Sequence, residues 1–91
     1  MRHVYTMKTG HINHRLDIRD LPYTVQELTL LAQKYSDDVA VIIGKRKAAE
    51  GIGFERIILI VRNRQPITIM CRRESQNFDK RNFNVSKVVY Q

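Results

Sequence analysis

Three side chains near the start of the chain, His11, Arg15 and Arg19, are spaced four residues apart. Positions i, i+4 and i+8 of an α-helix lie roughly on one face, so this spacing predicts a stripe of one imidazole and two guanidinium groups. Guanidinium groups bind phosphate bidentately and stay charged, whereas an imidazole titrates near neutral pH and can move a proton. The stripe is therefore suited to chemistry on a polyanion. A solvated basic helix face, or ion pairs between the arginines and nearby carboxylates, would have the same spacing.

The overall charge of the chain favours a functional interpretation of this stripe. Its 91 residues contain 16 Lys and Arg against 9 Asp and Glu, which gives a net charge of +7. A surplus of this size in so short a chain indicates an acidic partner, most commonly nucleic acid, with an anionic membrane or an acidic protein as alternatives. The hydrophobic fraction of 43% is typical of a folded chain rather than a disordered basic tail. The length predicts one domain over residues 1–91 with a modest core.

Residues that form disulfides or bind metals are few. Cys71 is the single cysteine, so it cannot form a disulfide within the chain, and its place at the end of an apolar run predicts a buried structural thiol. One cysteine and three scattered histidines offer no zinc-binding spacing, and we expect no metal or other cofactor. No apolar stretch approaches the ~20 residues that cross a bilayer, and the N-terminus lacks the apolar core of a signal peptide. We expect a cytoplasmic protein with no membrane partner.

The first third of the sequence predicts two helices. The first covers about residues 10–19 and ends before Pro22, because the residue preceding a proline is pushed out of the helical region. The second begins with a capping box in which Thr24 is the N-cap and Glu27 reaches back to it, and it should end near residues 35–37. The side chains of the first helix that we expect to face the core are Ile12, Leu16 and Ile18.

The rest of the chain contains β-branched apolar runs that are typical of strands. The expected strands cover residues 39–43, 56–62, 67–71 and 85–90. Lys45, Arg46 and Lys47, together with the glycines that follow, predict a basic loop, and residues 74–82 predict a polar surface loop. The expected fold class is α+β, with two N-terminal helices packed on one face of a three- to four-stranded antiparallel sheet.

The opening pattern of the chain resembles a known group of proteins. His11, Arg15 and Arg19, followed by a Leu-Pro step into the capped helix at Thr24, resemble the start of a small uncharacterised bacterial and phage family. That family is grouped with the BrnT-like and RelE/ParE-like toxin ribonucleases. The resemblance covers residues 9–90 and implies a RelE/BrnT-like arrangement of helices and sheet.

The strand at residues 67–70, followed by Arg72 and Arg73, is similar to the last central strand of the same family. The resemblance implies metal-independent cleavage of RNA, in which the 2′-hydroxyl of the RNA is the nucleophile, a base takes its proton and cations stabilise the charged phosphorane. It implies that His11 acts as base or acid beside arginines that clamp the phosphate. The residues expected to take part in catalysis are His11, Arg15, Arg19 and Arg72. The residues expected to bind nucleic acid are Lys45, Arg46, Lys47, Arg73 and His14, and weaker candidates as proton donors are Ser75 and Tyr90.

Other functions use the same residues without catalysis. The alternatives are a nucleic-acid-binding module, which needs only the basic surface, and a phage-type inhibitor that docks on an acidic host protein. The expected partners are RNA, free or presented by a ribosome, and an acidic antitoxin or host protein. The chain is expected to be a monomer or a homodimer, because the last strand would present an edge to a second copy.

Overall fold

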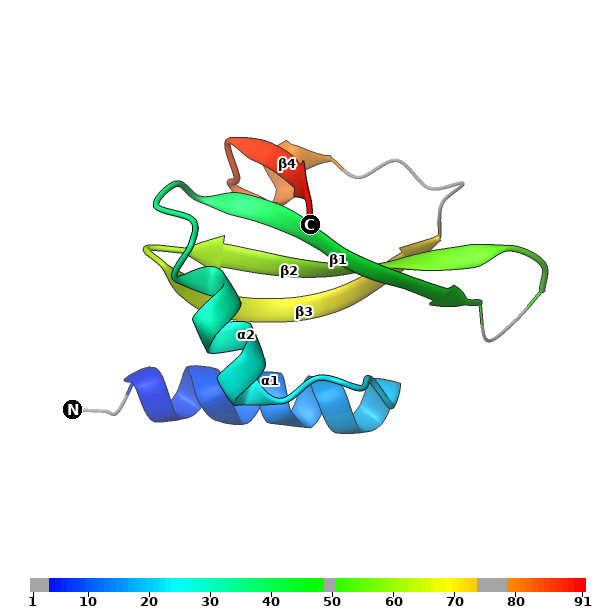
Figure 1. Ribbon diagram of the computed structural model, residues 1–91, viewed down its shortest axis with the longest axis horizontal. Coiled ribbons are helices and arrows are strands. Elements are labelled where there is room, and N and C mark those ends of the chain that lie inside the picture. The colour runs from blue at the N-terminus through cyan, green and yellow to red at the C-terminus, as the bar shows by residue number, and fades with distance from the viewer. Residues whose placement is uncertain (1–3, 49–50, 74–78) are drawn as a thin grey trace.

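Two α-helices precede a four-stranded sheet in the residues that the computed structural model describes, which are 4–48, 51–73 and 79–91 (Figure 1). The elements in chain order are α1 (Val4–Arg19), α2 (Val25–Ala32), β1 (Val39–Lys47), β2 (Phe54–Arg62), β3 (Gln65–Arg73), the 3-10 helix η1 (Lys80–Phe83) and β4 (Lys87–Tyr90). The strand order across the sheet is β3-β2-β1-β4. The α+β class expected from the sequence is confirmed.

Helix α1 is longer than predicted, because it begins at Val4 and carries Gly10 in its interior. A glycine inside a helix costs only ~1 kcal/mol relative to alanine, and packing of the helix on the sheet offsets this cost. Ile12 and Leu16 are buried as expected, but the prediction for Ile18 is wrong, since 61% of its surface is exposed. Two residues of helix turn the chain by about 200°, so Ile18 points away from the side that Leu16 buries.

The end of α1 and the start of α2 are both fixed by local hydrogen bonds. Asp20 adopts a left-handed conformation with φ of 51°, and the amide of Leu21 donates to the carbonyl of Leu16 at 3.0 Å, as in a Schellman motif. At α2, the amide of Glu27 donates to the Thr24 hydroxyl at 3.1 Å, and the Thr24 amide donates to the Glu27 carboxylate at 2.9 Å. The predicted capping box is confirmed. The helix ends earlier than predicted, at Ala32.

The sheet is mixed, so the prediction of a fully antiparallel sheet is wrong. Strands β1 and β2 pair antiparallel, as do β2 and β3, but β4 pairs parallel with β1. The connection between β3 and β4 runs from one edge of the sheet to the other, and its 13 residues (74–86) are enough for a crossover. The Arg62 guanidinium donates to the carbonyl of Phe83 at 2.6 Å, and the amide of Ser86 donates to the carbonyl of Asp38 at 2.8 Å. These bonds hold the end of the crossover against β2 and the start of β1.

The basic segment Lys45–Lys47 is part of β1, so the prediction of a loop there is wrong. Each of its residues pairs with one of β2, and the last pair is Lys47 with Phe54. Pairing of the two strands overrides the polar character of the segment. Because β4 pairs with β1 only over Val39–Ile42, the basic half of β1 forms an outer edge of the sheet, where lysines are common.

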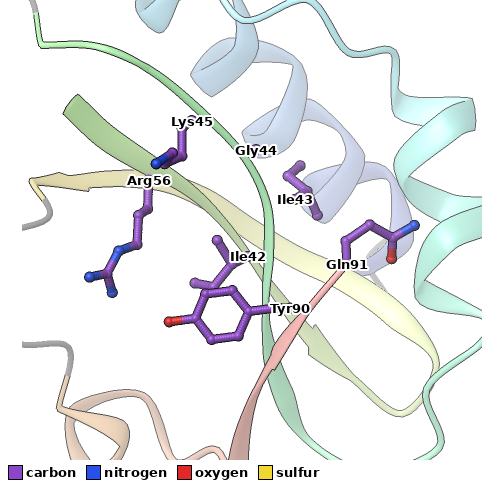
Figure 2. Close-up of a pocket in the computed structure, with 7 residues that line it drawn as sticks. All are labelled: Ile42, Ile43, Gly44, Lys45, Arg56, Tyr90 and Gln91. Atoms are coloured by element: carbon purple, nitrogen blue, oxygen red, sulfur yellow. The ribbon is translucent and has the colours of Figure 1, made fainter.

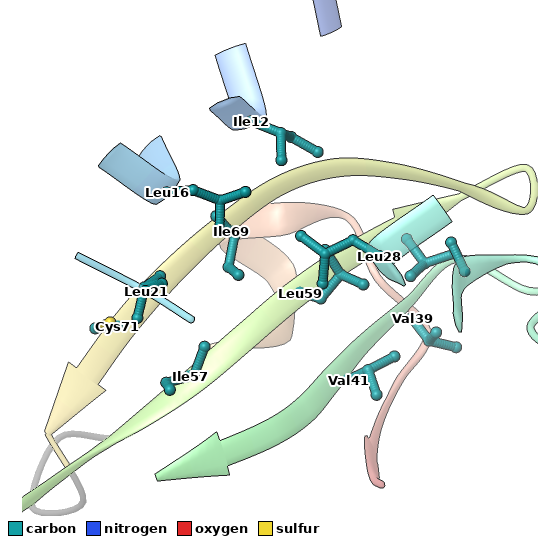
Figure 3. Packing of buried hydrophobic residues seen from close by; sticks show 12 residues of the cluster. Ile12, Leu16, Leu21, Leu28, Val39, Val41, Ile57, Leu59, Ile69 and Cys71 are labelled. Carbon is teal, nitrogen blue, oxygen red and sulfur yellow. The ribbon is translucent and has the colours of Figure 1, made fainter. Parts of the chain in front are cut away.

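Apolar side chains fill both faces of the sheet. On the helix-covered face, the buried cluster includes Ile12, Leu16 and Leu28 of the helices above Val41, Leu59 and Ile69 of the strands (Figure 3). On the opposite face, the buried cluster consists of Ala40, Ile42, Ile58, Ile60, Met70 and Val85, with Phe83 and Val88 packed against it. Phe83 and Val85, near the end of the crossover, therefore cover part of the second face.

None of the described helices is long and apolar enough to cross a membrane.

Candidate nucleic-acid interface

Helix α1 carries the predicted stripe, and its first member is held against the sheet. His11 Nε2 and Thr68 Oγ1 of β3 lie 2.9 Å apart in a hydrogen bond. Arg15, one turn further along, is half-buried, and His14 is exposed on the helix. The imidazole is therefore oriented by a hydroxyl from β3, with one guanidinium group a turn away.

Arg46 has a structural role at the other end of α1. Its Nε donates to Glu55 Oε1 at 3.1 Å, and its guanidinium also donates to the backbone carbonyls of Arg19 and Asp20. A cation at the C-terminal end of a helix satisfies carbonyl groups that have no partner in the helix and interacts favourably with the helix dipole. Arg46 thus ties α1 to β1 and β2, and little of its charge is left for a ligand.

Beside Arg46 lies an open depression of about 490 Å³ that is lined by Ile18, Arg19, Asp20, Arg46, Lys47 and Glu55. Within the described part of the chain, the Arg19 Nε atom is buried without a hydrogen-bond partner. Glu55 forms an ion pair with Arg46, and the other cations that line this depression are Arg19 and Lys47. The depression therefore combines cations with a carboxylate, which would oppose a bound anion.

Arg72 lies on the face of the sheet opposite the one that α1 covers. Side chains alternate along β3, so Arg72 shares the face of Met70, which belongs to the cluster opposite the helices. Its guanidinium lies over the ring of Phe83, 5.8 Å from the centroid. Arg72 lies four residues along β3 from Thr68, the residue that contacts His11, which is roughly 13 Å of strand.

Arg72 instead belongs to a row of cations that crosses three strands. The register pairs Lys45 of β1 with Arg56 of β2, and Arg56 with Arg72 of β3. Residues directly opposite each other on neighbouring strands lie on the same face with Cβ atoms ~5 Å apart. We call Lys45, Arg56 and Arg72 the cationic row. The cationic row lies on the face opposite the helices, next to the apolar cluster on that face.

The neighbouring row on the helix-covered face has a different charge pattern. There the register places Glu55 between Arg46 and Arg73. Arg73 is exposed, and its guanidinium nitrogens lie 3.7 Å from the place that a Cβ on Gly51 would occupy. A carboxylate between two guanidinium groups neutralises part of their charge, whereas all three register partners in the cationic row are cations.

Aromatic rings flank the cationic row. The Lys45 Nζ atom lies 5.5 Å from the centroid of the Phe54 ring, and Phe54 is 47% exposed. Tyr90, at the end of β4, is 67% exposed and pairs in register with Ile42. Figure 2 shows the Tyr90 ring against Ile42, on the same side of β1 as the Arg56 side chain.

Tyr90 and Arg56 line one pocket. It has a volume of about 340 Å³ and is formed by Ile42, Ile43, Gly44, Lys45, Arg56, Tyr90 and Gln91. Its apolar wall comes from Ile42 and Tyr90 and its charge from Lys45 and Arg56 (Figure 2). The pocket can therefore receive a group with a flat apolar part and an attached anion.

Two groups on the helix-covered side of the sheet, the Cys71 thiol and the Tyr23 hydroxyl, have raised pKa values. Burial raises the pKa of the Cys71 thiol, nearby Glu55 raises it further, and Arg46 and Arg19 partly offset the rise. Burial also raises the pKa of the Tyr23 hydroxyl, with a smaller contribution from the Glu27 carboxylate. Both groups are therefore neutral at neutral pH, which agrees with the expected structural role of Cys71.

The sequence analysis missed Arg56, which it treated only as the start of a strand, and Phe54, which lies before that expected strand. The sequence does contain a signal, because Phe54 and Arg56 alternate in the way that places two side chains on one face of a strand. Their position beside the basic segment Lys45–Lys47 follows only from the register between β1 and β2. Among the expected donors, Tyr90 lines the pocket, and Ser75 lies outside the described residues. The described residues contain no group of three or more side chains suited to hold a metal ion.

No family model matches the chain, and comparisons with curated proteins and with solved structures give no significant match. The resemblance of the His11 stripe to toxin ribonucleases therefore stays a prediction.

Proposed function

We propose that this protein binds nucleic acid through the face of the sheet that carries the cationic row. The observation that supports this proposal is the register of Lys45, Arg56 and Arg72, which lie side by side across three strands. A phosphate backbone would place its negative charges along this row, next to all three cations.

The shape and charge of the face also support a polymeric anion. The row extends across β1, β2 and β3, and Lys47 lies two residues beyond Lys45 on the same strand. Positive charges spread along a surface bind successive phosphates better than they bind one small anion. The net charge of +7 adds a long-range attraction to the same class of partner.

The test is removal of two charges from the row by Lys45→Gln with Arg56→Gln. Binding of a labelled mixed-sequence RNA, measured by fluorescence anisotropy, should weaken at least about tenfold, because a hydrogen bond to a charged group contributes ~1.5 kcal/mol or more. The control is Lys34→Gln with Lys87→Gln, which removes two charges near the opposite end of β1. Equal affinity of the two double variants would overturn the proposal.

A second candidate function is metal-independent cleavage of RNA at α1. The observation that favours it is the hydrogen bond between His11 Nε2 and Thr68 Oγ1, which orients an imidazole one turn from Arg15. An oriented imidazole beside a guanidinium group supplies a base and a phosphate clamp for attack by the 2′-hydroxyl. This site is centred on Thr68, four residues along β3 from Arg72 of the cationic row.

The second candidate is tested by incubating labelled single-stranded RNA with the protein in EDTA. Products with 2′,3′-cyclic phosphate ends should appear with the wild type and be reduced 10²-fold or more by His11→Ala, because general acid–base catalysis contributes ~10²–10⁴-fold. The His14→Ala variant removes an exposed imidazole from the same helix and should cleave normally. Intact RNA with the wild type, or equal cleavage by His11→Ala, would reject this role for His11.

A further inference from the structure

Two aromatic side chains that are largely exposed lie on one face of the sheet. Among the described residues, five large hydrophobic side chains are exposed, and they are Ile18, Leu30, Ile52, Phe54 and Tyr90. The two aromatic members, Phe54 and Tyr90, both lie on the face of the cationic row. By register, Tyr90 pairs with Ile42 and Phe54 pairs with Lys47, so the two rings are separated along β1 by five residues.

We infer that the nucleic acid bound here is single-stranded, and that one of its bases stacks on Tyr90 in the pocket beside Arg56. The inference rests on the proposed function and names the class of nucleic acid. Bases in a duplex are stacked on one another and cannot reach an aromatic side chain, whereas unpaired bases stack readily on Tyr and Phe.

The geometry of the pocket supports a nucleotide. Its volume of about 340 Å³ lies near the lower end of the range for small-molecule sites, ~300–1,000 Å³. The Tyr90 ring and Ile42 supply an apolar wall for a base (Figure 2). Lys45 and Arg56 line the same pocket and supply charge for the attached phosphate. A flat base and its phosphate therefore find complementary groups in one pocket.

Phe54 extends the site along β1. Five residues of strand span roughly 17 Å at ~3.3 Å per residue, and Lys45 lies between the two rings. A stacked single strand rises ~3.4 Å per nucleotide, so a chain of about five nucleotides would reach from Tyr90 to Phe54. This length lies within the ~4–16 nucleotides that one small binding domain commonly covers.

The decisive experiment compares one labelled RNA of about ten nucleotides as a single strand and as a duplex with its complement. The wild type should bind the single strand more tightly. Tyr90→Ala should weaken binding of the single strand about 5- to 150-fold, which corresponds to the loss of one base–aromatic stack, and leave binding of the duplex unchanged. Tyr90→Phe retains the ring and should bind as the wild type does.

Two further variants keep the result interpretable. Leu30→Ala removes an exposed apolar side chain from α2 and should leave binding unchanged, and Phe54→Ala provides a second test of stacking should Tyr90→Ala fail to fold. If the duplex binds as tightly as the single strand and neither ring variant changes binding, the inference fails while the proposed function stands. If neither form of RNA binds the wild type, the proposed function fails as well.

Discussion

Gly44 shows how one missing Cβ positions a side chain over β1. The Tyr23 hydroxyl lies above it and donates a weak hydrogen bond to the carbonyl of Ile43 at 3.5 Å. A Cβ built on Gly44 would lie 2.7 Å from the Tyr23 oxygen, which is closer than real Cβ atoms approach other atoms. The register between β1 and β2 also shifts between Ile42 and Gly44. Glycine at this point therefore lets Tyr23 close over the strand just before its basic half begins.

We predict that Gly44→Ala lowers the free energy of unfolding by about 1–3 kcal/mol, because overpacking at a contact of this kind costs that amount. Tyr23→Phe removes the oxygen that the new methyl group would meet. The double variant should therefore be more stable than Gly44→Ala alone, as measured by urea denaturation. Strictly additive losses in the two single variants and the double variant would show that the Tyr23 hydroxyl is not the obstacle.

Helix α2 has only eight residues, so its termini matter for its stability. Thr24 and Glu27 exchange two hydrogen bonds that satisfy amide groups with no partner within the helix. The same helix carries Leu28 and Ala32, which are buried in the cluster on the helix-covered face of the sheet. The capping box therefore supports both the helix and the packing above the sheet.

We predict that Thr24→Ala lowers the free energy of unfolding by about 1 kcal/mol, which corresponds to a decrease in Tm of roughly 4–8 °C for a domain of this size. Thr29→Ala is the matched control within α2. Its hydroxyl donates to the carbonyl of Val25 at 2.8 Å, a bond that competes with helix formation, so alanine should be neutral or stabilising there. Calorimetry of both variants checks the result, and equal losses in Tm would contradict a capping role for Thr24.

At the scale of helices and strands, features that depend on neighbouring residues could be predicted from the sequence, whereas the pairing of strands that are distant in the chain could not. The capping box at Thr24 depends on residues three positions apart, so the sequence contains the whole interaction. The parallel pairing of β4 with β1 joins residues 48 positions apart, such as Val39 and Lys87, and no local pattern specifies it. The extension of β1 through Lys47 was missed for the same reason, because its pairing with Phe54 stabilises a segment whose own composition is typical of a loop.

At the scale of the whole molecule, six of the 16 Lys and Arg residues lie near one end of the sheet, on β1, β2 and β3. These cations lie on both faces of the strands, and on the helix-covered face the register places Glu55 between Arg46 and Arg73. The net charge predicted a basic surface that binds an acidic partner, and the sequence analysis named Lys45 and Arg72 among the expected site residues. The sequence could not show that Lys45 and Arg72 lie in one row, because the two residues are joined only through Arg56 on the strand between them.

We predict that salt weakens binding of single-stranded RNA, with a slope that depends on the cationic row. Each phosphate contact contributes ~0.7 to the slope of log K against log salt concentration, so Lys45→Gln with Arg56→Gln should make the slope shallower by about 1.4. The Lys34→Gln and Lys87→Gln double variant should keep the wild-type slope. Titrations at several salt concentrations provide the measurement, and an unchanged slope in the first variant would mean that these side chains do not contact phosphates.

The place of β4 beside β1 has a consequence for the order in which the protein can assemble during synthesis. Val39–Ile42 needs Lys87–Tyr90 to complete its hydrogen bonding, and those residues are made 48 positions later. At ~5–20 residues per second, a ribosome takes roughly 2–10 s to supply them. During that interval a nascent chain presents an uncovered apolar strand, which is the kind of segment that pairs with other chains. The last residues of the sheet thus act as its protection against aggregation.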